Sequence, residues 1–233
     1  MLLLAISILP VVLLLIYVNR QDKYEKEPPG MLILAFFAGM LAIPLTLLLV
    51  AITNTAFYSD SVFYSAFIEA GLPEELSKFI ILFLIIWWNK NFNEHMDGIV
   101  YATFVSLGFA CVENILYVFG GGLGTGIMRA IISVPGHFLF GVLMGYFLSL
   151  AKFSKSGKFF LILLSILVPA CIHGLFDWLL MATDVVGNGL GLILILLFIA
   201  LDIFMWIAGI RSIRKHRENS PFKNPTPPSP NLY

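Results

Sequence analysis

Long apolar runs separated by short polar segments dominate the chain. Each run approaches the roughly 18 to 20 residues that a helix needs to cross the hydrocarbon core of a bilayer. Strand-type alternation of apolar and polar residues is absent, which excludes an outer-membrane barrel. The pattern predicts an all-α, polytopic transmembrane helical bundle of about seven spans, at roughly residues 2–18, 31–53, 64–88, 98–118, 127–150, 159–181 and 188–209.

The composition supports the membrane class. The 233 residues are 59% hydrophobic and only 12% charged, whereas a soluble domain carries about 25% charged residues. The formal net charge is +0, so no nucleic-acid partner is implied. We expect a multi-pass protein of the plasma membrane, with the lipid bilayer as its surroundings.

Lysine and arginine collect in alternate connections between the predicted spans. The connections at 19–30, 89–97 and 151–158, together with the tail after 210, hold 12 of the 14 basic residues. Basic connections face the cytoplasm, so the N-terminus is predicted outside and the C-terminus inside. Residues 218–233, rich in Pro, Asn and Ser, are predicted to form a disordered cytoplasmic tail.

Two adjacent carboxylates interrupt the third predicted span. Charged groups are costly at membrane depth and usually serve a function there. Glu74 and Glu75 are followed by Lys78, which is placed one helical turn away and can pair with either carboxylate. Pro73 suits the first turn of a helix, so residues 57–72 are expected to form a kinked extension ahead of the two glutamates.

Four further polar residues lie in other predicted spans: Glu113, His137, His173 and Asp177. Counted from the basic end of its span, each of Glu74, Glu113, His137 and His173 lies about 20 Å deep. The polar groups should therefore meet at one level, in the outer third of the bilayer. His173 and Asp177 have i, i+4 spacing, so they share one helix face, and the carboxylate is suited to orient the imidazole.

Each signal also has a structural interpretation. Glu74, Glu75 and Lys78 are equally suited to an ion pair that joins helices, and a lone Glu113 or His137 to an interhelical hydrogen bond. Arg129 is expected to extend to the membrane interface, with contact to a substrate or to a balancing charge as the second interpretation. A transporter or channel with a proton or ion relay is the alternative from a different class of function.

Taken together, the motifs resemble those of the PrsW family of intramembrane proteases. In chain order they are Asp22-Lys-Tyr-Glu25-Lys-Glu27-Pro28, Glu74-Glu75-Leu-Ser-Lys78, Asp97-Gly98-Ile-Val-Tyr101, Phe109-x-x-x-Glu113-Asn114, His137 and His173-x-x-x-Asp177. The resemblance covers roughly residues 20–180. It implies an intramembrane protease domain over residues 1–217. The implied reaction is the first (site-1) cleavage of a single-span, membrane-bound anti-sigma factor on its extracytoplasmic side, and the anti-sigma factor is the implied partner.

The family is similar to the CAAX-type glutamic intramembrane proteases, which suggests roles for single residues. By that resemblance Glu74 activates water, Glu75 is its structural neighbour, and His173 with Asp177 stabilises the oxyanion. The sequence departs from the relatives at three positions: Lys78 replaces an arginine one residue later, Glu113 takes the place of a histidine, and His137 is added. A CAAX-type processing or immunity protease stays as an alternative that differs in substrate.

The sequence is compatible with either a metal-free or a zinc-dependent mechanism. The predicted catalytic residues are Glu74, Glu75, Glu113, His137, His173 and Asp177, with Lys78 as their structural ion-pair partner. A glutamate-activated water needs no metal, and no cofactor is assigned on that interpretation. Glutamate and histidine are also zinc ligands, and a zinc enzyme is expected to use Glu74, Glu113, His137 and His173.

Overall fold

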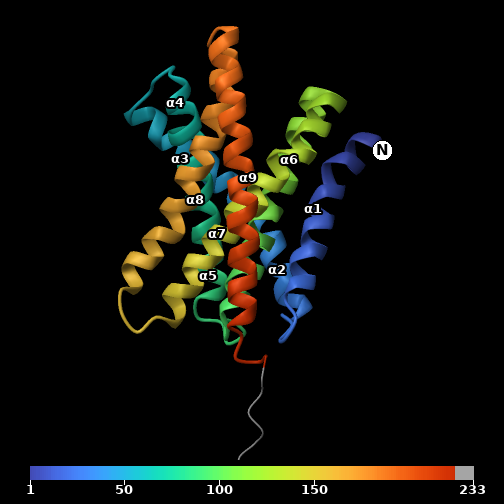
Figure 1. The fold of residues 1–233 in the computed structure, drawn as a ribbon, viewed down its shortest axis with the longest axis vertical. Helices are drawn as coiled ribbons and strands as arrows, with labels where there is room; N and C mark the ends of the chain where they lie inside the picture. The colour runs from blue at the N-terminus through green and yellow to red at the C-terminus, as the bar shows by residue number, and fades with distance from the viewer. Residues whose placement is uncertain (224–233) are drawn as a thin grey trace, which may run out of the picture.

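The structure is a computed structural model that describes residues 1–223, and within that range it is helical without strands (Figure 1). The predicted all-α class is confirmed. In chain order the elements are α1 (Leu2–Gln21), α2 (Pro29–Met40), α3 (Ala42–Ala56), α4 (Val62–Tyr64), the π-helix η1 (Ser65–Gly71), α5 (Leu72–Ile86), α6 (His95–Ile131), α7 (Ser133–Phe153), α8 (Lys158–Met181), the 3₁₀-helix η2 (Ala182–Asp184) and α9 (Asn188–Glu218).

Five helical stretches are long and apolar enough to cross a membrane, so the chain is a multi-pass membrane protein. They are Leu2–Gln21, Pro29–Ala56, His95–Phe153, Lys158–Asp184 and Asn188–Glu218. The predicted count of seven spans is not confirmed by this criterion. Two of the predicted spans are merged into one stretch, and α5 has only 15 residues, fewer than a span requires by itself.

The predicted connection between two spans at 119–126 is almost entirely helical in the structure. Only Gly122 departs from helical geometry, with φ 79° and ψ −165°, a backbone region open essentially to glycine. The two arms then lie against each other: Gly126 approaches the side chain of Val118, and Gly145 approaches the backbone of Gly98. Gly122 therefore reverses the chain, and the long stretch is a helical hairpin.

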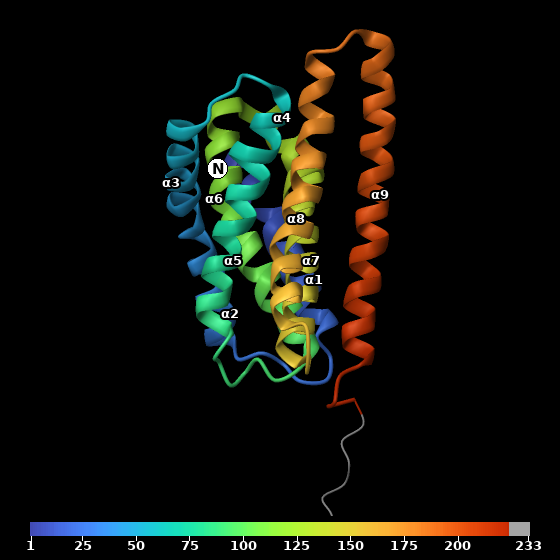
Figure 2. The same ribbon diagram turned by 90° about the vertical axis from the view of Figure 1, so that its left-hand side faces the viewer.

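The second predicted span bends in the middle. Leu41 separates α2 from α3, whereas the sequence pattern predicted one straight helix over 31–53. Pro44 lies four residues after Met40 and has no N–H to donate to its carbonyl, which weakens the helix at this point. As a result α3 turns away from the bundle toward the edge opposite α9 (Figure 2).

The core surrounds the first arm of α6, which packs against α1, α2, α5 and α7. Glycines, which have no side chain, allow the backbones of these helices to approach closely. A Cβ at Gly39 would overlap the backbone of Val105, and a Cβ at Gly145 would overlap the backbone of Gly98. Gly141 and Gly145 thus lie on the face of α7 that packs against α6.

The segment ahead of the two glutamates is a wide helix rather than a break in the chain. The π-helix η1 continues directly into α5, and Glu74 and Glu75 occupy the first turn of α5, as predicted. The predicted kinked extension over 57–72 is thus largely α4 and η1. Gly71 lies against the backbone of Ala170 and Gly174 in α8, which fixes the start of α5 beside that helix.

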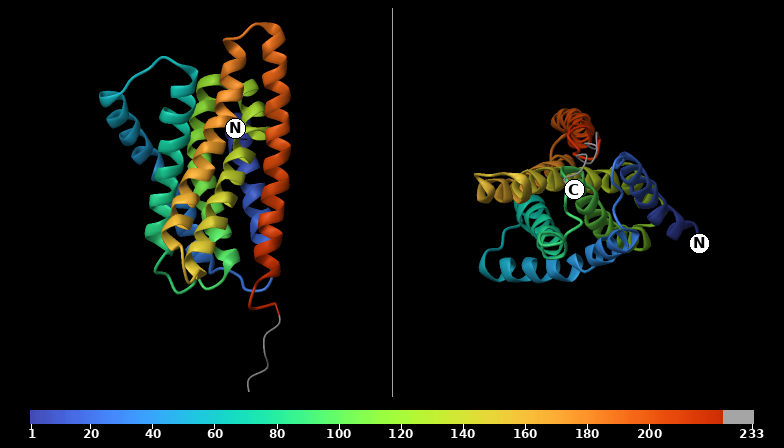
Figure 3. Two further views of the ribbon diagram at one scale, coloured as in Figure 1. Left: turned by 60° about the vertical axis from the view of Figure 1, so that its left-hand side comes forward. Right: turned by 90° about the horizontal axis from the view of Figure 1, so that it is seen from below.

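The two ends of the bundle differ. The connections at 22–28, 87–94 and 154–157 share one end with the last turn of α9, and the N-terminus lies toward the other end (Figures 1 and 3). The helix α9 continues to Glu218, beyond the predicted limit at 209. Residues 224–233 of the predicted disordered tail lie outside the described residues.

Candidate active site

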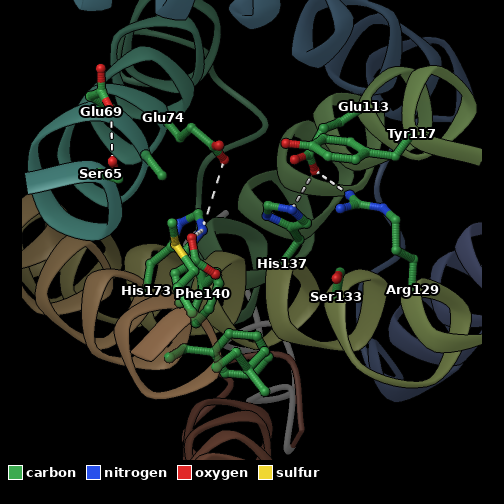
Figure 4. A pocket seen from close by; sticks show the side chains of 15 residues that line it. Ser65, Glu69, Glu74, Glu113, Tyr117, Arg129, Ser133, His137, Phe140 and His173 are labelled. Carbon is green, nitrogen blue, oxygen red and sulfur yellow. Dashed lines mark hydrogen bonds and ion pairs between the residues drawn. The ribbon is translucent and has the colours of Figure 1, made fainter. Parts of the chain in front are cut away.

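A cavity of about 470 Å³ opens between η1, α5, α6, α7 and α8 (Figure 4). Five of the residues predicted to form a site line it: Glu74, Glu113, His137, His173 and Asp177. They come from four helices and meet at one level, as the depth argument predicted. Glu75 and Lys78 lie directly behind this wall and are fully buried.

Lys78 is the centre of the buried charge cluster. Its Nζ donates to Glu75 Oε1 at 2.7 Å and to Glu74 Oε2 at 3.2 Å, and lies 3.1 Å from His137 Nδ1. The ring of Phe109 packs beneath the ammonium at 4.1 Å, a cation–π contact that strengthens in a desolvated place. One lysine thus holds two carboxylates and an imidazole from two helices.

His173 joins α8 to the same cluster. Its Nδ1 lies 3.0 Å from Glu75 Oε1, and its Nε2 lies 3.3 Å from Asp177 Oδ2 and 4.0 Å from Glu74 Oε2. Phe140 stacks on the imidazole with 4.5 Å between ring centroids, which fixes the ring plane. Because carboxylates face both ring nitrogens, the ring is fully hydrogen-bonded only when both nitrogens carry hydrogen.

Glu113 forms a second ion-paired group on the opposite wall. Its Oε2 lies 2.7 Å from His137 Nε2 and accepts a hydrogen bond of 2.7 Å from an Arg129 guanidinium nitrogen. Arg129 Nε also donates to Asn114 Oδ1 at 3.0 Å. The prediction that Arg129 extends to the interface is therefore wrong: the Gly122 reversal places it beside Glu113, where it balances the carboxylate charge.

The four carboxylates of this region differ in the exposed fraction of their side chains. The side chain of Glu75 is 0% exposed, that of Glu74 11%, that of Glu113 15% and that of Asp177 27%. Water or a peptide in the cavity therefore reaches Glu74, Glu113 and Asp177 but not Glu75. Glu113 is already bound by Arg129 and His137, and Asp177 does not contact Lys78. Glu74 is thus the carboxylate that both borders the cavity and pairs with the buried lysine.

Several residues at the mouth of the cavity were missed by the sequence reasoning. Glu69 Oε1 accepts from Asn54 at 2.7 Å and its Oε2 from Ser65 at 3.0 Å, and Glu69 and Ser65 both line the cavity. Tyr117 lies over the Arg129 guanidinium at 4.2 Å. Glu69 is five residues before Glu74, a spacing that an α-helix places about 140° apart. The wider turns of η1, which ends at Gly71, reduce this angle.

The arrangement fits a metal ion by donor chemistry. One ligand atom from each of Glu74, Glu75, His137 and His173 lies within 4.8 Å of the others, and zinc binds mixed nitrogen and oxygen donors. The set differs from the predicted one because Glu75 takes the place of Glu113. Glu113 instead contacts His137 from the far side of the ring, the position of a carboxylate that orients a metal-bound histidine.

Comparisons with known proteins agree with this geometry. A family model described as PrsW family intramembrane metalloprotease matches residues 27–205. The chain is 34% identical over 213 residues to Protease PrsW of Geobacillus kaustophilus, covering 91% of each chain. It is 34% identical over 212 residues to Protease PrsW of Bacillus subtilis, covering 91% of this chain and 94% of the relative. No solved structure matches the chain.

The family model and the two relatives each match most of the sequence, and the range that the family model matches contains every residue that lines the cavity. The relatives are named as proteases, so the chain is a peptide hydrolase. The chain therefore belongs to the PrsW family of intramembrane proteases.

Proposed function

We propose that the protein is an endopeptidase that makes the first cut in a single-span anti-sigma factor, on its extracytoplasmic side, with a glutamate-activated water. The observation that carries the reaction is the pairing of Glu74, which reaches the cavity, with a buried ion-pair cluster behind it. The anti-sigma substrate is carried over from the resemblance to the family.

Glu74 is the proposed general base. Its carboxylate borders the cavity and is held on one side by Lys78 at 3.2 Å, which leaves other lone pairs free for a water molecule. The water oxygen attacks the peptide carbonyl carbon while its proton passes to Glu74. When the tetrahedral intermediate collapses, the C–N bond breaks, and Glu74 returns the proton to the leaving amine.

Glu75 is proposed to position its neighbours rather than to react. It is 0% exposed and contacts Lys78 and His173 at 2.7 and 3.0 Å. These contacts fix the lysine that orients Glu74 and the imidazole that faces Asp177. A group held in this way reduces the reorganisation needed when charge develops in the cavity.

His173 and Asp177 are the proposed stabilisers of the oxyanion. His173 Nε2 points to Asp177 Oδ2 at 3.3 Å, at the border of the cavity, where a carbonyl oxygen can exchange for the carboxylate as hydrogen-bond acceptor. Arg129 supplies a further cationic group on the opposite wall. Preorganised donors of this kind act strongly where water is excluded.

Zinc remains an open part of the proposal. Glu74, Glu75, His137 and His173 would hold the ion, and the ion would supply a Lewis acid that polarises the peptide carbonyl and acidifies bound water. Lys78 weighs against it, because its ammonium contacts three of these four residues. A divalent ion at the same place requires the lysine to release them, so we favour the glutamate mechanism.

The proposed topology has seven crossings, with the N-terminus outside. The Gly122 reversal supports it, since it divides His95–Phe153 into two antiparallel arms, and η1 with α5 supplies another crossing. Glu113 lies nine residues from Gly122 and eighteen from His95, or about 14 Å against about 27 Å along the helix. The cavity is thus nearer the end without basic connections, which the positive-inside rule places outside.

Cleavage by purified protein in proteoliposomes tests the proposal. The probe is a single-span protein with an extracytoplasmic domain, and mass spectrometry locates the cut. We expect Glu74→Gln to lower the rate by roughly 10² to 10⁴-fold, the range for loss of a general base, and the matched control Glu218→Gln, at an exposed position, to cleave normally.

Two results would contradict the proposal. Wild-type activity in a folded Glu74→Gln protein would remove the assigned base. A cut on the side that carries the basic connections would overturn the topology. Ion flux through the same proteoliposomes, abolished by Glu74→Gln without any cleavage by the wild type, would instead support the relay alternative.

A further inference from the structure

A second cluster of carboxylates lies at the opposite end of the bundle from the cavity. Two of the sequence motifs that the peptidase chemistry does not use meet there: the connection between α1 and α2, and the first turn of α6. Glu25 and Glu27 come from the connection and Asp97 from α6, and one carboxylate oxygen from each lies within 4.8 Å of the others. We call these three residues the acidic triad.

The triad is deeply placed for a group of charges. Asp97 is 0% exposed and Glu27 3% exposed. Two more buried carboxylates stand beside it, those of Asp22, at 0%, and Glu94, at 2%. Among residues 1–223 none of these five carboxylates forms an ion pair, and the nearby Lys26 directs its ammonium to the carbonyl of Asn19.

Unused oxygens are the second observation. Asp97 Oδ2 accepts hydrogen bonds from the backbone N–H groups of Asn93 and Glu94 at 2.8 and 2.7 Å, and Glu27 Oε2 accepts one from the Tyr101 hydroxyl. Another oxygen of each residue, Asp97 Oδ1, Glu27 Oε1 and Glu25 Oε2, is buried without a hydrogen-bond partner within the described residues. Buried polar atoms are normally partnered, so such a group needs an explanation.

The backbone and Tyr101 thus orient one oxygen of Asp97 and of Glu27, and the free oxygen of each is left for another partner. A shared proton between Glu27 and Asp97 satisfies two of the oxygens and leaves that of Glu25 alone.

We propose that the acidic triad of Glu25, Glu27 and Asp97 binds one hard divalent cation, such as Mg²⁺, Mn²⁺ or Ca²⁺, that ties the α1–α2 connection to the start of α6. An all-oxygen, carboxylate-rich donor set selects these ions over zinc or copper. Ligand oxygens on opposite sides of a Ca²⁺ ion at about 2.4 Å stand about 4.8 Å apart, so three oxygens that all lie within 4.8 Å of one another can bind the same ion.

The site is independent of the catalytic cavity. Along α6, Asp97 and Glu113 are sixteen residues apart, or about 24 Å, and the triad contains no histidine, whereas the cavity cluster contains two. The ion acts on the fold, because it holds a connection outside the membrane against the helix that carries Glu113. Its removal should loosen that connection before it affects the reacting groups.

Direct ion binding tests the proposal on the full-length protein in detergent after dialysis against chelator. The probe is Mn²⁺, followed by electron paramagnetic resonance, in competition with Mg²⁺ and Ca²⁺. We expect one saturable ion per chain and a rise of the thermal midpoint with each ion, but not with NaCl at equal ionic strength. The Glu75→Gln protein should bind the ion equally well, since its altered group lies in the other cluster.

Variants assign the site. Glu25→Gln changes a half-buried ligand on a connection, so the protein should fold, and we expect at least tenfold weaker Mn²⁺ binding and a smaller thermal shift. Glu27→Gln should have the same effect, and the control Asp184→Asn, an exposed acid at the other end, should have none.

Three results would overturn the proposal: absence of saturable Mn²⁺ binding by the wild type, undiminished binding by Glu25→Gln, or binding that is lost in Glu75→Gln. A thermal midpoint that responds to acidification but to none of the three ions would assign the triad to a shared proton.

Discussion

The two buried clusters differ in how the negative charge of their carboxylates is balanced. In the cavity cluster, Glu74 and Glu75 share the ammonium of Lys78, and Glu113 is paired with Arg129. In the acidic triad, by contrast, no lysine or arginine within residues 1–223 pairs with a carboxylate. The first cluster carries its own counter-charges from the chain, which a group at membrane depth requires. The second lies at the membrane edge, where ions from solution can reach it.

The largest effect is expected from a variant that removes the counter-charge of Glu74 and Glu75. Lys78→Met removes the ammonium that Glu74 and Glu75 share and leaves these two buried carboxylates without it, which should cost about 3 to 5 kcal/mol of the free energy of unfolding. Denaturant unfolding in detergent measures it. The control Lys90→Met, at an exposed position, should be near neutral.

A second substitution sharpens that result. Because Glu75→Gln removes one of the uncompensated charges, the double variant Lys78→Met with Glu75→Gln should recover part of the lost stability. A single Lys78→Met variant as stable as the wild type would show that the ion pairs seen here do not balance the buried charge.

Chelation of divalent ions should affect the two clusters differently: it should lower the stability that depends on the acidic triad but not the cleavage that depends on the cavity cluster. Removing divalent ions is expected to lower the free energy of unfolding through the acidic triad, by about 2.7 kcal/mol relative to an ion concentration of 100 Kd. Cleavage measured well below the unfolding temperature should persist, because Lys78 supplies positive charge to the cavity. Loss of cleavage that stoichiometric zinc restores would replace the glutamate mechanism with a metal mechanism.

A smaller change is expected at the half-exposed wall of the cavity. Arg129→Gln leaves Glu113 with His137 as its partner, so the charge stays partly balanced. We expect a roughly tenfold lower cleavage rate, equivalent to about 1.4 kcal/mol, and little change in stability. Single-turnover cleavage checks it, and an unchanged rate would assign Arg129 to packing alone.

The smallest effect concerns salt. In divalent-free buffer, Glu25→Gln should stabilise the protein by a few tenths of a kcal/mol, because it removes one charge from a like-charged group. The gain should shrink as NaCl is raised to about 1 M, where the screening length falls to about 3 Å. Charges behind the cavity wall are inaccessible to that screening, so the stability difference between Glu75→Gln and the wild type should not respond to salt.

The sequence was sufficient to predict which polar residues meet and which of them pair within one helix, Lys78 with Glu74 or Glu75 and His173 with Asp177, but not the pairs between helices. Glu74, Glu113, His137 and His173 have similar depths in their predicted spans, and equal depth lets side chains meet once the helices turn these faces toward one another. The contact of Arg129 with Glu113 was missed because it depends on the reversal at Gly122. The two predicted spans on either side of this glycine-rich stretch implied antiparallel helices, but the sequence does not say that a single positive φ at Gly122 makes the turn or which side chains of the two arms then touch.

The contact between the residues of the acidic triad likewise could not be predicted from the sequence. The motif at Asp22–Pro28 and the motif at Asp97–Tyr101 were both recognised, yet 69 residues separate Pro28 from Asp97. Only the packing of α6 against α1 and α2 brings them into contact. The bend at Leu41 was missed because Pro44, its local cause, is tolerated in many membrane helices.

The π-helix η1 has a consequence for how a substrate approaches. Ser65, Glu69 and Glu74 all border the cavity, although residues nine apart on an α-helix, at about 100° each, point in opposite directions. The wider turns of η1 rotate the chain less per residue and bring all three onto one wall. If a substrate peptide binds along this wall, it meets the acceptor groups of Ser65 and Glu69 before it reaches Glu74, the proposed base. On that proposal one continuous helical segment would both guide the peptide and activate the water.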